Sequence, residues 1–158
     1  MSMHNKMKLF TKYAFLFLVG GLVYMGIELI WRQRTHWSMG IVGGLCFVEI
    51  GLINEILSWK TGLIKQALLG ATLVTVNEFI AGVIINILLG WDVWDYSNLP
   101  FNIMGQVCLL FFFLWIFVSI FAIVLDDYLR YRFFGEDRPE YYIGNKHIVP
   151  FHSKCKIS

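Results

Sequence analysis

Residues 101–125, FNIMGQVCLLFFFLWIFVSIFAIVL, decide the fold, because the whole stretch carries no charged side chain. An α-helix needs about 20 apolar residues to cross the hydrocarbon core of a bilayer. Three earlier stretches have a similar length and character: Tyr13–Trp31, Trp37–Trp59 and Leu63–Gly90. The sequence therefore predicts an all-α, polytopic membrane protein that consists of one antiparallel unit of four transmembrane helices.

The composition also indicates a membrane protein. Hydrophobic residues make up 58% of the 158 positions and charged residues only 15%, whereas soluble domains average about 25% charged residues. The first hydrophobic stretch lacks a small-residue cleavage pattern, so we expect a retained helix and not a cleaved signal peptide. The predicted division is a cytoplasmic N-terminal segment (1–12), a four-helix transmembrane domain (13–125) and a cytoplasmic C-terminal tail (126–158).

The positions of lysine and arginine predict the orientation, because cytoplasmic flanks carry an excess of these residues. Basic residues concentrate before the first stretch, between the second and third, and in the tail, at Lys6, Lys8, Lys12, Lys60, Lys65, Arg130, Arg132, Arg138, Lys146, Lys154 and Lys156. The connection 91–102 contains none. We therefore expect a multi-pass protein of the cell membrane with both termini in the cytoplasm. The net charge of +2 gives no indication of a nucleic-acid partner.

The hydrophobic stretches contain four glutamates, Glu28, Glu49, Glu55 and Glu78. A charged side chain at membrane depth costs about 3 kcal/mol or more, so such residues tend to face a bundle interior, a partner or a water-filled cavity. Glu49 lies about 120° around the helix from Glu55. We expect it to face the fourth helix or another subunit.

Polar residues near the outer ends of the helices form the first group of candidates. Glu28 and Arg32 have the four-residue spacing of a helix ion pair. They either neutralise each other or form, with His36 and with Asp95 from the third connection, an outward-facing recognition site.

The second group lies deeper in the membrane or near its inner face. Glu78 and Asn86 share a polar stripe of the third helix, and Gln106 is expected near the outer end of the fourth. Asn54 and Glu55 are either a gate-like polar pair or the place where the second helix meets lipid headgroups. The candidate binding or pathway residues are therefore Glu28, Arg32, His36, Asn54, Glu55, Glu78, Asn86, Asp95 and Gln106.

Motifs for catalysis or cofactor binding are absent from the sequence. The four histidines do not cluster, and no Ser, Cys and His spacing supports a catalytic triad. We therefore assign no catalytic residue, metal or cofactor. A phosphate-binding loop is also missing, so the chain is not itself an ATPase.

Several short motifs occur along approximately residues 15–130. They comprise Thr35-His36-Trp37-Ser38-Met39, Gly43-Gly44, Gly51-Leu52-Ile53-Asn54-Glu55, Glu78-Phe79-Ile80-Ala81-Gly82 with Asn86, Val93-Trp94-Asp95-Tyr96-Ser97, Pro100-Phe101-Asn102 and Gly105-Gln106-Val107-Cys108-Leu109. Together these motifs resemble a family of small bacterial membrane proteins, the CmpB-like family labelled "putative ABC-transporter type IV". The resemblance implies a small polytopic integral membrane protein, and it implies no substrate or catalytic residue.

Three classes of function compete. The first is a permease-like protein or permease subunit with a carboxylate-lined interior. Because four helices are few for a complete pathway, it would need a homodimer or a membrane partner subunit, and a separate ATPase. The second is a non-transport scaffold or accessory subunit, whose polar stripes hold helices together. The third is a membrane enzyme acting on a lipid, with Glu28, His36 and Asp95 as acid–base groups.

Overall fold

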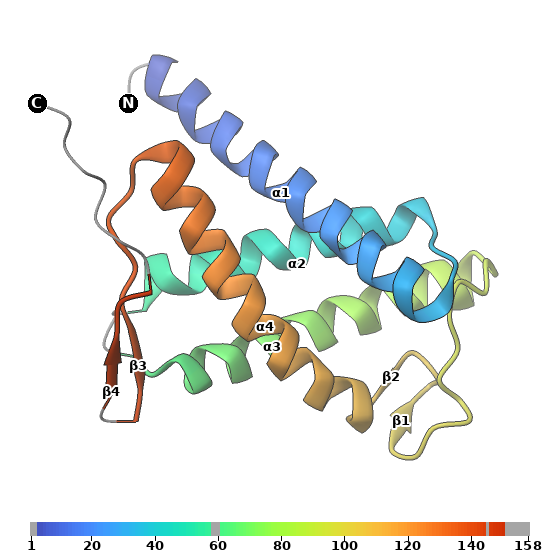
Figure 1. Ribbon diagram of the computed structural model, residues 1–158. Helices are drawn as coiled ribbons and strands as arrows, with labels where there is room; N and C mark the ends of the chain where they lie inside the picture. Colours follow the sequence, from blue (N-terminus) through green and yellow to red (C-terminus); the bar gives the residue numbers. More distant parts are fainter. Residues whose placement is uncertain (1–2, 58–60, 145, 151–158) are drawn as a thin grey trace, which may run out of the picture.

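The computed structural model describes residues 3–57, 61–144 and 146–150 (Figure 1). Within these residues, the main helices are α1 (Met3–Arg32), α2 (Trp37–Ile56), α3 (Leu63–Gly82) and α4 (Leu109–Leu129). Two π-helical turns extend them, η1 (Val83–Leu88) after α3 and η2 (Arg130–Phe134) after α4. Two short antiparallel hairpins complete the described chain, β1 (Asn102–Ile103) with β2 (Val107–Cys108) and β3 (Tyr141–Ile143) with β4 (Lys146–Ile148).

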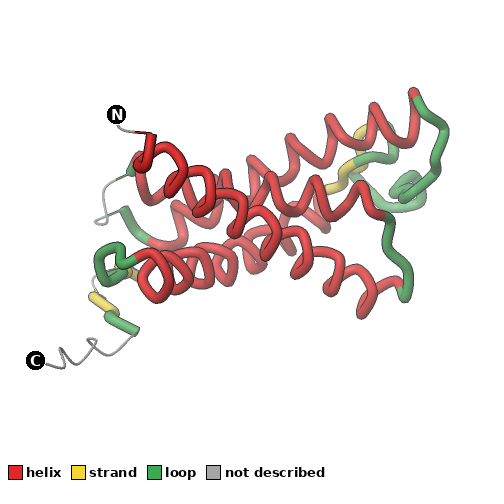
Figure 2. The backbone as a smooth tube through the Cα atoms, turned by 90° about the horizontal axis from the view of Figure 1, so that it is seen from above, coloured by secondary structure: helices red, strands yellow, loops and turns green. Residues whose placement is uncertain are grey.

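The prediction of an all-α protein with four spanning helices is confirmed. In the described residues, four helical stretches are long and apolar enough to cross a membrane, Asn5–Arg32, Trp37–Ile56, Leu63–Leu88 and Leu109–Phe134. Figure 2 shows them as one elongated bundle. We call the end with the connections 33–36 and 89–108 the loop end. The opposite end, where α1 begins and η2 ends, is called the terminal end.

Glycines bring α1 and α2 into close contact. A methyl group on Gly44 of α2 would lie 2.6 Å from the backbone oxygen of Phe17 in α1. Gly21 of α1 likewise faces the backbone carbonyl of Gly40. Such backbone proximity allows helices to pack in lipid, where apolar side chains gain little by leaving the acyl chains. The four-residue spacing of Gly40 and Gly44 therefore places two small residues of α2 against α1.

The start of the fourth helix was predicted wrongly. Residues 101–108 form a turn and the β1–β2 hairpin, and α4 begins only at Leu109. Phe101, Met104 and Gly105 have left-handed φ angles of 55°, 53° and 69°, which a right-handed helix does not accommodate. Gln106 consequently lies before α4 and not within its outer end.

The helices also extend further at the terminal end than predicted. α1 includes residues 3–12, and the last helix continues through Asp126 and Asp127 to Phe134. The following tail packs as well, since Tyr141 is buried at the start of β3. α2 is helical to Ile56; its predicted end at Trp59 and the tail residues 151–158 lie outside the described residues.

Candidate functional site

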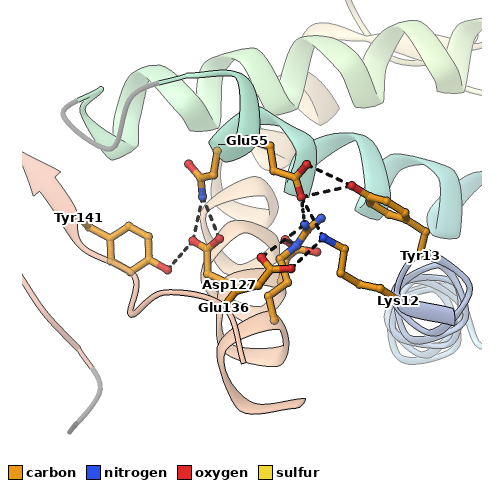
Figure 3. A network of polar contacts seen from close by, with 9 residues as sticks. Lys12, Tyr13, Glu55, Asp127, Glu136 and Tyr141 are labelled. Carbon is orange, nitrogen blue, oxygen red and sulfur yellow. Dashed lines mark hydrogen bonds and ion pairs between the residues drawn. The ribbon is translucent and has the colours of Figure 1, made fainter. Parts of the chain in front are cut away.

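A group of polar side chains lies at the terminal end, in two neighbouring sets of hydrogen bonds and ion pairs (Figure 3). We call it the terminal-end network. It consists of Lys12, Tyr13, Asn54, Glu55, Asp126, Asp127, Arg130, Glu136 and Tyr141.

Glu55 connects three helices within this network. Its carboxylate forms an ion pair with Arg130 of η2, which continues α4, and another with Lys12 of α1 at 3.2 Å. Tyr13 also donates a hydrogen bond to it, at 3.1 Å. Lys12 in turn lies 2.8 Å from Glu136. One carboxylate of α2 thus holds α1 and the end of α4 together.

Arg130 is the most buried cation of the network, with 3% of its surface exposed. Its Nε lies 2.5 Å from Asp126, which is fully buried one helical turn earlier. Gly51 of α2 makes room for that carboxylate, because a Cβ there would overlap the oxygens of Asp126. Burial of two opposite charges at one point compensates part of the cost of removing each from water.

A second branch of the network anchors the tail. Asn54 donates to both oxygens of Asp127, at 3.0 and 2.8 Å, and Tyr141 donates to the same carboxylate at 2.8 Å. Burial, followed by the neighbouring Asp127 carboxylate, raises the pKa of Tyr141 well above its usual value. Tyr141 therefore remains a donor, and β3 stays attached to α2 and α4.

A cavity of about 440 Å³ opens beside these contacts. Its walls are mostly polar and carry four carboxylates and one guanidinium, and they are formed by Gly51, Asn54, Glu55, Asp127, Arg130, Gly135, Glu136 and Asp137. A site of this composition can accept polar or cationic groups more readily than anions.

At the loop end, Glu28 and Arg32 form the ion pair that their spacing indicates. Thr35 donates to the second oxygen of Glu28 at 2.6 Å. Arg32 also donates to the backbone oxygen of Val93 at 3.3 Å. The pair therefore joins the end of α1 to both loop-end connections.

Glu78 lies in the bundle interior, 2% exposed. Trp115 of α4 donates to one carboxylate oxygen at 2.9 Å, and Tyr96 donates to the other at 3.0 Å. Burial, followed by the nearby Glu78 carboxylate, raises the pKa of Tyr96 well above its usual value. Each carboxylate oxygen of Glu78 therefore accepts a hydrogen bond, and together these bonds fasten the 89–108 connection to α3 and α4.

Asn86 and Gln106 form a further pair at the loop end. The Asn86 amide donates to Gln106 at 2.8 Å and to the Trp94 carbonyl at 3.0 Å, while its oxygen accepts from the Val93 amide at 2.8 Å. The Trp94 indole donates to the Gln106 carbonyl at 2.9 Å. These two predicted residues meet, and they hold the connection against the bundle.

Two predicted members of the outer group do not join Glu28. His36 caps α2, where its ring accepts from the Ser38 amide at 3.4 Å. Asp95 is exposed and accepts from the Ser97 amide at 2.8 Å. Hydrogen bonds from the Ser97 hydroxyl and amide lower the pKa of Asp95. Asp95 therefore stabilises its own turn, and Glu28, His36 and Asp95 form no shared acid–base cluster.

Glu49 contacts α3, whereas the fourth helix or another subunit was expected; a contact with another subunit stays a prediction. Asn77 of α3 donates to its carboxylate at 2.5 Å. The contact joins α2 to α3 and gives this intramembrane carboxylate a polar partner.

Sequence reasoning missed most of the terminal-end network. The charged residues after Leu125 were interpreted as the place where the chain leaves the membrane. A signal was present, because Asp126 and Arg130 have the spacing of a helix ion pair. The described residues contain no group of three metal-binding side chains that could hold an ion.

Comparison with known proteins identifies the relatives of this chain. A family model with the description "Putative ABC-transporter type IV" matches residues 3–136. Neither the curated proteins nor the solved structures gave a match. The match covers most of the chain and includes the four spanning helices of the described residues, so the chain belongs to the "Putative ABC-transporter type IV" family.

Proposed function

We propose that the chain is a permease-like membrane subunit of an ABC-type transport system, located in the cell membrane with both termini in the cytoplasm. Membership of the family and four membrane-spanning helices support this proposal. Because the sequence lacks a phosphate-binding loop, ATP hydrolysis would come from a separate ATPase.

The terminal-end network is the observation that carries the proposal. Glu55 contacts cations from both α1 and η2, so a change at this one carboxylate affects the relative position of three helices. A polar cavity of about 440 Å³ lies directly beside it. In this proposal the network is the inner gate of a pathway, closed in the conformation described here.

A second copy or a partner subunit is part of the proposal. Between the terminal-end network and Glu78, the described core is mainly apolar and includes Cys46, Ile50, Val74 and Ile123. An ion crossing this layer within one chain would meet the full cost of desolvation. A homodimer, or a complex with another membrane subunit, could supply the missing polar surface.

The test is purification of the full chain, expressed at its natural level, from its own membranes in a mild detergent. An ATP-hydrolysing protein is expected to co-purify, and ATP hydrolysis is expected to change in a Glu55→Gln complex that still assembles. Recovery of the chain without any ATP-hydrolysing partner would contradict the proposal.

A scaffold or accessory role is the second candidate, and the loop-end contacts favour it. Glu78, Asn86 and Gln106 all have partners within the chain, as expected for side chains that hold helices and a loop together. This role predicts that Glu78→Gln reduces assembly with a partner while transport by the assembled fraction stays normal. If the chain is a permease, Glu78→Gln is expected to leave assembly intact and to reduce transport.

A further inference from the structure

A groove between α1 and α4 remains open along the membrane-spanning part of the bundle. In the view of Figure 1, the two helices diverge toward the loop end. Two adjoining cavities of about 100 and 190 Å³ lie between them. The cavities share four wall residues, Tyr24, Ile27, Trp115 and Val118, so they form one continuous groove.

The groove changes character along its length. The part toward the terminal end has almost entirely apolar walls, with Phe121, Ala122 and Leu125 of α4 on one side. The part at the loop end contains the Glu28–Arg32 ion pair and Tyr96. This gradient fits an amphiphile whose apolar chain points toward the terminal end and whose polar head lies at the loop end.

Tyr24 adds a polar group to the middle of the groove. Its ring stacks on Trp115 with the centroids 5.8 Å apart, and its side chain forms part of both cavity walls. Among the residues that the structure describes, its hydroxyl donates no hydrogen bond to another side chain or carbonyl. A phenol at membrane depth is stabilised by an acceptor, which the ester region of a lipid would supply.

We propose that the groove binds one acyl chain of a zwitterionic phospholipid, with the phosphate at Arg32 and the ammonium group at Glu28. Arg32 uses only part of its five N–H donors on Glu28 and Val93. A carboxylate likewise has lone pairs left after accepting from Arg32 and Thr35. An anionic headgroup would gain the contact with Arg32 but be repelled by Glu28.

The charges at the loop end of the groove favour a lipid headgroup as the occupant. The Glu28–Arg32 pair offers one carboxylate and one guanidinium, which match a headgroup that carries both signs. The inference goes beyond the proposed function and does not rest on it.

Native mass spectrometry of the detergent-purified full chain tests this site with three defined lipids of identical acyl chains: phosphatidylethanolamine, phosphatidylglycerol and diacylglycerol. The parent is expected to retain one phosphatidylethanolamine about tenfold more tightly than diacylglycerol, since charged groups bind the headgroup. Phosphatidylglycerol is expected to fall between them. Equal retention of the three lipids would overturn the headgroup assignment.

Two matched pairs of variants locate the site. Val118→Trp fills the groove and is expected to abolish lipid retention, whereas Val76→Trp, at an exposed position of α3, is expected to leave it unchanged. Arg32→Gln is expected to reduce phosphatidylethanolamine to the level of diacylglycerol, and the exposed Arg34→Gln is expected to have no effect. Unchanged retention in Val118→Trp would overturn the proposal. If that variant does not fold, Ala122→Leu replaces it. Loss of lipid retention is then the expected result, and unchanged retention would overturn the proposal.

Discussion

Arg130 and Glu55 form an ion pair at the terminal end although 75 residues separate them in the chain. The same guanidinium also binds the fully buried Asp126. Arg130 therefore compensates a carboxylate of its own helix and one of α2 at the same time. Loss of this one cation would leave a buried negative charge within the spanning stretch Leu109–Phe134.

Replacement of this arginine is expected to destabilise the bundle strongly. Removing one partner of a buried ion pair typically costs about 3–5 kcal/mol, because the other charge stays buried without compensation. Arg130→Leu should therefore unfold at a clearly lower temperature in detergent, measured by circular dichroism. Arg132→Leu is the control, since Arg132 is exposed. Equal melting temperatures for the two variants would show that Arg130 does not stabilise the fold.

Glycine replacement tests the close contact between α1 and α2. A Cβ at Gly44 would lie 2.6 Å from the Phe17 backbone oxygen, so Gly44→Ala should cost about 1–3 kcal/mol, as overpacking does. Gly26 has open space around its Cβ position, and Gly26→Ala should be neutral or stabilising because alanine is the better helix former. Denaturant unfolding of both variants provides the comparison. A destabilised Gly26→Ala beside an unaffected Gly44→Ala would contradict this packing.

The two donors on Glu78 predict a difference between two substitutions. Glu78→Gln keeps an acceptor for Trp115, and the Tyr96 hydroxyl can turn to accept from the new amide. Glu78→Leu leaves both buried donors unpaired, at about 1–3 kcal/mol each. The leucine variant should therefore be the less stable of the two in thermal unfolding. If Glu78→Leu were the more stable variant, these hydrogen bonds would make no net contribution to the free energy of unfolding.

Asn86 should control the order of the 89–108 connection. Asn86→Ala removes its hydrogen bonds to Trp94, Val93 and Gln106. Backbone amides of the connection should then exchange with deuterium faster, while those of the α3 helix keep their protection. Asn98→Ala is the matched control, because Asn98 is exposed in the same connection. Equal exchange in both variants would exclude an anchoring role for Asn86.

The spanning helices were predictable because length and hydropathy determine them, but the interruption at residues 101–108 was not. That segment carries no charged side chain, like the first 17 residues of the helix after it, and the left-handed backbone at Phe101 and Met104 has no compositional sign. The continuation of the last helix through Asp126 was missed because this part of the helix is charged. Charged residues normally end a hydrophobic span. Only the four-residue spacing of Asp126 and Arg130 indicates their pairing, and Glu55, the second partner of Arg130, lies in a different helix.

Part of the candidate site was predictable for a similar reason. Glu28 with Arg32 is a local pair, visible as a four-residue spacing. Glu78 with Trp115, and Glu55 with Lys12, join residues far apart in sequence, and their distances depend on how the helices pack. Helical periodicity gives the face of one helix, and it does not give the partner that this face meets.

The most direct test of the central claim is a distance measurement across the terminal end during ATP hydrolysis. Spin labels at the exposed Phe10 of α1, Ile56 of α2 and Phe133 of η2, taken in pairs, report the separation of three helices without replacing a network residue. The sample is the full chain with its co-purified ATPase, before and after trapping with ATP and vanadate. If the network is a gate, at least one of the distances is expected to increase in the trapped state. Identical distance distributions in both states, in a complex that hydrolyses ATP, would contradict the proposed gate.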